Sequence, residues 1–501
     1  MWWQKYKDAG QRFHKQLIGF TQPSLALIVS GISFCYFLAF LSLIPQLPGL
    51  IGDHGLLPVR LLKNAYYQNY GILGIWEMKS LAWWVHSGLG LQVVATIGLV
   101  SSLLAVLGRF RRASLLVSWI VYGSLFVAGQ SFLSFQWDSL LLESGIVALC
   151  MTFALQSTHK ETWSTLLLVR LLASKVMLSA GLAKWTSGDI WWREGTALMV
   201  HFETQPLPTI LGWMAHQLSG DVLLWGMAFM WVSEIIAPLL AFIPGRTRFY
   251  SALCMLLFQG SILLTGNYGF FNILTMVLIL SFWVKETPET ANQSKAIRKS
   301  PLSLLRNFSV PKNFCFFGFK KWGQNMSPSV LAKHSIPLLL SLTLLLGVGN
   351  RFFFHSPNLG LIERTLAEWR IQFQYGLFSV MTYPRWELSF SLSEDKSTGH
   401  EVPFYYKPTT LNKLPWVTPY MPRLDWMMWF AALHPAPQQL PWIQRLGNGL
   451  LTKTPDILRL LPPLPEGDFR YIQIHRRQYR FTDIEEYEKT GNYWVEATQV
   501  Y

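Results

Sequence analysis

The chain has 501 residues, of which 51% are hydrophobic and only 14% carry charge. This composition is too apolar and too poor in charge for an ordinary soluble protein. Several apolar stretches also reach the roughly 20 residues that cross a bilayer. The sequence therefore predicts a polytopic α-helical membrane bundle, followed by a soluble α+β C-terminal domain.

The apolar stretches predict eight or nine membrane spans, because one is short and two adjacent ones allow a re-entrant pair. They lie near residues 24–44, 81–107, 113–132, 139–156, 164–183, 222–243, 250–266, 269–284 and 336–350. The implied organisation is a helical membrane bundle over residues 1–284, a basic linker over 285–335, a last span over 336–350 and an extracytoplasmic domain over 357–501.

The distribution of charge predicts which side each loop faces. The net charge is +14, but residues 357–501 hold 15 Lys plus Arg against 15 Asp plus Glu, so the surplus precedes Pro357. With nine spans, four basic clusters fall on the side of the N-terminus: 5–15, 109–112, 246–248 and 285–333. Basic loops stay in the cytoplasm. We therefore expect a cytoplasmic N-terminus, an extracytoplasmic C-terminal domain and no nucleic-acid partner for that domain.

The C-terminal residues change from uniform apolarity to alternation. Residues 386–392 alternate apolar and polar side chains, as a half-buried strand does, and residues 402–406 repeat the pattern. Residues 469–482 and 493–500 also predict strands, whereas 423–434 and 441–461 predict short helices, the second interrupted by glycine and proline.

The segment 181–208 concentrates charged groups and indoles between two apolar runs, which is typical of a membrane interface. Ionised groups inside the spans require a partner or a function, because burying each one at bilayer depth costs on the order of 3 kcal/mol. We expect either a salt-bridge network inside the bundle or a polar cavity beside 181–208, with Glu143 or Glu234 facing the basic groups. Lys175 is a further basic group in a span. The polar candidates are Asp138, Glu143, Arg170, Lys184, His201, Glu203, Gln205, Glu234, Asn267 and Asn272.

One predicted helix offers a surface for a partly folded client protein. Its first turns combine an arginine, two indoles and two methionines, and such adaptable apolar surfaces suit protein binding. The candidates are Arg423, Asp425, Trp426, Met427, Met428 and Trp429. The alternative is that the apolar members pack the domain core, with Arg423 and Asp425 on the solvent side or capping the helix.

Seven stretches, in order along nearly the whole chain, resemble the lipase maturation factor family. One reads Gln374-Tyr-Gly-Leu-Phe, and another reads His201-Phe-Glu-Thr-Gln-Pro-Leu-Pro. The full set is 34–52, 134–145, 201–208, 266–276, 374–378, 404–408 and 423–432. The resemblance implies a multi-pass endoplasmic reticulum membrane protein with a lumenal C-terminal domain. Animal members help secreted lipases fold and assemble, so it also implies a secreted client protein as partner.

The chain departs from the animal members, since its C-terminal domain has no cysteine. It looks like a bacterial member, for which the membrane is the inner membrane and the lumen becomes the periplasm. A more distant likeness, around Gly181-Leu-Ala-Lys-Trp, is to the membrane fold of vitamin K-dependent carboxylases, in which a lysine at the place of Lys184 acts as a base. We expect Lys184 to be structural, and we expect no metal and no cofactor. An enzyme using Lys184 is the alternative.

Overall fold

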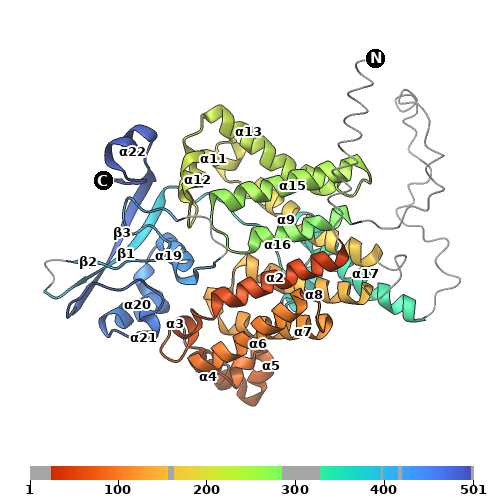
Figure 1. Cartoon of the computed structure of the whole chain (residues 1–501), viewed down its shortest axis with the longest axis horizontal. Coiled ribbons are helices and arrows are strands. Elements are labelled where there is room, and N and C mark those ends of the chain that lie inside the picture. The colour runs from red at the N-terminus through yellow and green to blue at the C-terminus, as the bar shows by residue number, and fades with distance from the viewer. Residues whose placement is uncertain (1–23, 156–162, 285–327, 396–398, 416–419, 498–501) are drawn as a thin grey trace.

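A computed structural model describes residues 24–155, 163–284, 328–395, 399–415 and 420–497. Figure 1 shows a helical bundle with the C-terminal sheet and its helices against one end. The N-terminal basic cluster and most of the linker lie outside the described residues.

A helix occupies each of the nine stretches that the sequence predicts to be spans. Seven of these helices are long and apolar enough to cross a membrane. They are α2 (Leu25–Leu43), α6 (Gly88–Val106), α8 (Gln136–Ala154), α9 (Trp163–Thr186), the run Gly220–Leu240, α15 (Arg246–Thr265) and the run His334–Phe354 within α17 (Pro328–Gly349) and η9 (Asn350–Phe354). The other two are α7 (Arg111–Ala128) and the shorter α16 (Phe271–Ile279) with η6 (Leu280–Trp283).

The run Gly220–Leu240 is not a uniform helix. It consists of α13 (Gly220–Trp231), the π-helical turn η5 (Val232–Ile236) and α14 (Ala237–Leu240). A π-helical turn carries an extra residue per turn and is often found at functional sites. Here it carries Glu234, which faces α9.

Short helices connect the spans. Between α2 and α6 lie α3 (Leu47–Ile51), α4 (Val59–Tyr70), η1 (Gly71–Leu73), α5 (Gly74–Met78) and η2 (Leu81–Trp83). Later connections are η3 (Gln130–Leu133), α10 (Ile190–Arg193), α11 (Ala197–Thr204) and α12 (Ile210–His216). The last span is followed by α18 (Pro357–Glu368).

The C-terminal part contains a four-stranded antiparallel sheet in the order β2-β1-β3-β4. Its strands are β1 (Arg385–Ser393), β2 (His400–Glu401), β3 (Tyr471–Phe481) and β4 (Trp494–Ala497). The accompanying helices are α19 (Arg423–Leu433), η10 (Pro437–Gln439), α20 (Pro441–Leu451), α21 (Pro455–Leu458) and α22 (Ile484–Thr490). The α+β prediction is confirmed.

One predicted strand is wrong. Residues 402–406 lie outside β2, which ends at Glu401. The Val402 amide still donates to the Phe390 carbonyl of β1 at 2.9 Å, but Pro403 has no N–H to continue the pairing. Further on, Oδ1 of Asp425 accepts hydrogen bonds from the backbone amides of Tyr406 and Lys407, each at 2.8 Å. These amides therefore bind the first turn of α19 instead of a neighbouring strand.

Candidate functional site

The segment 181–208 folds into the end of α9 followed by α10 and α11. Asp189 begins α10, where its Oδ1 accepts a hydrogen bond from the amide of Trp191 at 2.9 Å. Its Oδ2 accepts another from the amide of Met381 at 3.1 Å. The aspartate thus caps a helix and also fixes the chain that leads into the C-terminal domain.

Lys184 and Glu234 form a buried ion pair. The Lys184 ammonium donates to both Glu234 carboxylate oxygens at 2.8 Å. Gly181 allows this approach, since a Cβ at that position would lie 3.0 Å from the Cβ of Glu234. Of the two carboxylates that the sequence offers as partners for the basic groups, Glu234 is the one that faces Lys184. The pairing offsets part of the cost of burying the two charges.

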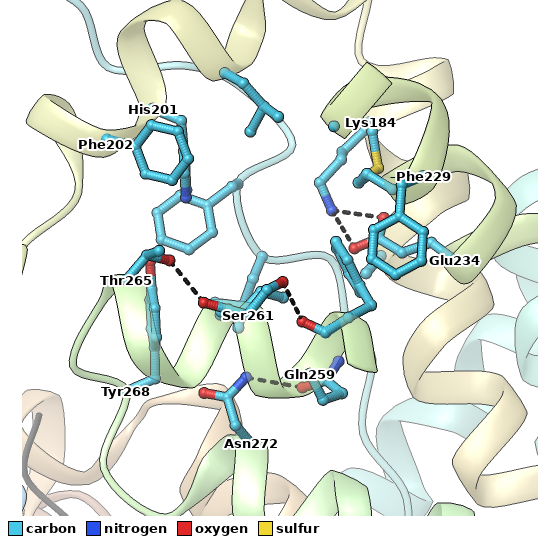
Figure 2. A pocket seen from close by; sticks show the side chains of 18 of the residues that line it. Lys184, His201, Phe202, Phe229, Glu234, Gln259, Ser261, Thr265, Tyr268 and Asn272 are labelled. Carbon is cyan, nitrogen blue, oxygen red and sulfur yellow. Dashed lines mark hydrogen bonds and ion pairs between the residues drawn. The ribbon is translucent and has the colours of Figure 1, made fainter. Parts of the chain in front are cut away.

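A cavity of about 340 Å³ lies beside this pair, among α9, α11, α13, α15 and α16. Figure 2 shows Lys184 and Glu234 on one side of it, His201 and Phe202 on another, and Asn272 and Gln259 below. Most of the lining is apolar, so the cavity differs from the polar one that the sequence predicts as an alternative. It combines an apolar body with a few converging polar groups, as ligand sites do.

Two buried polar atoms of the lining have no hydrogen-bond partner within the described part of the chain. They are Nδ1 of His201 and Oδ1 of Asn272. The Asn272 amide nitrogen donates to Oε1 of Gln259 at 2.8 Å, which leaves its oxygen for another donor. Burial, together with the charge of Lys184, lowers the pKa of His201 to about 4, so its ring is neutral near pH 7.

A second buried cluster joins the bundle to the chain that follows α18. Lys175 donates to Oε1 of Glu143 at 2.8 Å, and the Tyr375 hydroxyl donates to Oε2 of the same carboxylate. The next residue, Gly376, packs so closely that a Cβ there would lie 2.9 Å from the Cβ of Ala183. The stretch 374–378 therefore inserts between the helices. The sequence predicts the buried charges but does not identify Tyr375 as their partner.

The third cluster holds the C-terminal domain on the bundle. Arg423, in the first turn of α19, donates to the two carboxylate oxygens of Asp138 at 2.6 and 2.7 Å. Both side chains are fully buried. The Tyr122 hydroxyl donates to Asp138 at 2.5 Å, and the Arg423 amide donates to Oε1 of Gln46 at 2.9 Å. A bidentate arginine–carboxylate pair fixes both distance and orientation.

This geometry corrects the prediction for α19. The six candidates for client contact are all buried, and Arg423 lies on neither a solvent face nor a simple cap. Two indoles of the helix donate into the bundle: Trp426 to the carbonyl of Asn267 at 3.1 Å and Trp429 to that of Thr204 at 3.0 Å. The helix docks the domain onto the bundle and offers none of these side chains to a client.

The motif 201–208 binds the sheet of the C-terminal domain. Glu203 accepts a hydrogen bond from the amide of Phe481 at 3.0 Å, and burial raises its pKa. Gln205 is held by the Tyr268 hydroxyl and the Thr265 carbonyl, both at 2.8 Å. Arg385 of β1 donates to the Glu203 carbonyl at 2.7 Å. Sequence reasoning missed Arg385, although a basic residue that begins a half-buried strand is a signal for such a contact.

The remaining polar candidates are structural in their geometry. Arg170 donates to the carbonyls of Ser281 and Val284, both at 3.1 Å, which closes the end of η6. Asn267 donates to the Leu207 carbonyl at 3.2 Å. Glu143 pairs with Lys175 rather than with Arg170. Among the described residues, no group of three or more His, Cys, Asp and Glu side chains is placed to hold a metal.

Fold and site together define a multi-pass membrane protein with a C-terminal domain locked onto one end of its bundle. The lipase maturation factor transmembrane domain model matches residues 24–288, and the lipase maturation factor C-terminal domain model matches residues 371–500. The chain belongs to the lipase maturation factor family.

Curated relatives cover almost the whole chain. Lipase maturation factor 2 of Xenopus laevis is 30% identical over 91% of this chain and 78% of its own length. The mouse protein of the same name is 30% identical over 91% of this chain and 79% of its own length. Human lipase maturation factor 1 is 28% identical over 94% of this chain and 85% of its own length. These relatives give no support to the carboxylase alternative. No solved structure matches the chain.

Proposed function

We propose that this protein is a membrane-embedded maturation factor that assists the folding and assembly of secreted clients on the extracytoplasmic side, and that lipases are its client class. The names of its relatives support the client class. The observation that carries the proposal is the fully buried Arg423–Asp138 pair, which fixes the C-terminal domain at one end of the bundle as a platform for clients.

The positions of the basic clusters support an extracytoplasmic location for the C-terminal domain. At one end of the bundle, Arg111 contacts Ser30 near the start of α2 at 3.3 Å. At the other end, Gln46, just beyond α2, donates to the Met421 carbonyl of the C-terminal domain at 2.8 Å. Figure 1 shows the sheet at the end of the bundle where α2 finishes. If basic loops are retained in the cytoplasm, the domain faces the endoplasmic reticulum lumen, or the periplasm in a bacterium.

The activity is tested by deleting the gene in its host and measuring secreted lipase activity per amount of lipase antigen. We expect a severalfold drop in that ratio, restored by the full chain, with an unrelated secreted enzyme as the control. An unchanged ratio for the host's lipases contradicts lipases as the client class. Loss of other secreted proteins instead identifies a different client.

The orientation is tested with a reporter enzyme that is active only outside the cytoplasm. Fused after Tyr501, it is expected to be active, and fused at Ser300 in the basic linker, it is expected to be silent. The opposite pattern contradicts both the span count and the functional side.

A further inference from the structure

The cavity beside Lys184 has a lining that suits a ligand. Its volume of about 340 Å³ lies near the lower end of small-molecule sites, which are on the order of 300–1,000 Å³. Its walls are mostly aliphatic and aromatic side chains of α9, α11, α13, α15 and α16, among them Met177, Leu223 and Phe271. Such walls favour an apolar chain.

Exposed residues at the edge of the cavity offer an apolar ligand a path from the bilayer. Three apolar residues that line the cavity are also exposed on the outer surface: Leu218 and Val222 at 48% each and Phe229 at 36%. All three lie on α13 or just before it. The run Gly220–Leu240 is one of the membrane-spanning candidates. In a bilayer, side chains exposed along this run would face hydrocarbon, so Val222 and Phe229 give the cavity a route to lipid.

The polar groups restrict the head of the ligand. Lys184 and Glu234 are the charged residues of the lining, and they neutralise each other. An anionic head would therefore find no uncompensated cation among the lining residues. Two neutral groups of the lining instead have a buried atom without a hydrogen-bond partner. These atoms are Oδ1 of Asn272, which can accept a hydrogen bond, and Nδ1 of His201. A buried polar atom without a partner is costly, and a ligand hydroxyl can donate to Oδ1 of Asn272.

We propose that this cavity binds a neutral, single-chain lipid with a hydroxyl head, of the monoacylglycerol or fatty-alcohol class. The chain enters past α13 and lies against the apolar wall. The hydroxyl head donates to Oδ1 of Asn272. The proposal concerns a ligand of this protein itself and goes beyond its action on clients.

The test uses the purified full chain in phosphatidylcholine nanodiscs and a photoreactive monoacylglycerol analogue with a diazirine in its chain. We expect labelled peptides from α9, α13 and α15, and competition by unlabelled monoolein but not by oleate or added phosphatidylcholine. Labelling confined to outward-facing residues, or competition by oleate equal to that by monoolein, overturns the proposal.

Two variants and a control sharpen the result. Ala180→Phe places an aromatic ring in the lining and is expected to abolish specific labelling. Asn272→Leu removes the acceptor at nearly constant volume and is expected to weaken monoolein competition about tenfold. Leu257→Phe, on the exposed face of α15, is the control and should label normally.

Each variant is first checked for an unchanged unfolding temperature. Normal labelling of a folded Ala180→Phe or normal competition in a folded Asn272→Leu contradicts the site. Because the readout is binding, its failure leaves the maturation function untouched.

Discussion

Replacing Arg423 with methionine is expected to destabilise the protein by about 3–5 kcal/mol, because it leaves a buried carboxylate without its partner. Asp138 is fully buried, and its two oxygens receive the Arg423 guanidinium at 2.6 and 2.7 Å. Methionine keeps much of the volume and none of the charge. We expect a lower unfolding temperature in detergent micelles and faster proteolysis of the C-terminal domain in membranes.

Two further variants separate the lost charge pair from lost packing. Arg423→Met combined with Asp138→Leu removes both charges and is expected to recover most of the stability, since a buried ion pair and an apolar replacement are often close in free energy. Lys489→Met breaks an exposed pair with Glu485 and should have little effect. If Arg423→Met unfolds at the same temperature as the unaltered protein, the pair does not hold the two parts together.

The fold was largely predictable because its main elements follow from local patterns. Apolar length locates the helices of the bundle, and the alternation of Trp386, Leu388 and Phe390 locates β1. The exception is instructive. Residues 402–406 alternate like a strand, but the amides of Tyr406 and Lys407 donate to Asp425, nearly twenty residues away along the chain. A local sequence pattern cannot show that a carboxylate from another element will accept hydrogen bonds from backbone amides that would otherwise pair with a strand.

The charged members of the site were predictable, but Tyr375, Arg385 and the pairings between residues were not. The cost of charge in a bilayer correctly requires partners for Glu143, Lys184 and Glu234. It cannot say that Tyr375 reaches Glu143 across 232 positions, or that Arg423 reaches Asp138 across 285. Arg423 and Trp426 also look like exposed binding residues, because arginine and tryptophan serve protein interfaces. They do form an interface, but it is the one within this chain.

Replacing Lys184 with methionine is expected to cost about 3–5 kcal/mol, because Glu234 would keep a buried charge that Lys184 now neutralises. The ammonium lies 2.8 Å from both carboxylate oxygens. Lys184→Arg keeps the charge, whereas its larger planar group fits this pair less well, so a smaller loss is expected. Unfolding temperature and membrane insertion are the measurements.

The double variant Lys184→Met with Glu234→Gln decides between a structural lysine and a catalytic base. It removes both charges, so no uncompensated charge is buried and most of the stability should return. If Lys184 is structural, recovery of active client returns with stability, although no base is present at position 184. If the double variant is as stable as the unaltered protein but recovers no active client, the lysine performs chemistry and binding alone does not account for the function. Lys184→Arg provides the matching control, since arginine retains the positive charge but cannot serve as a base.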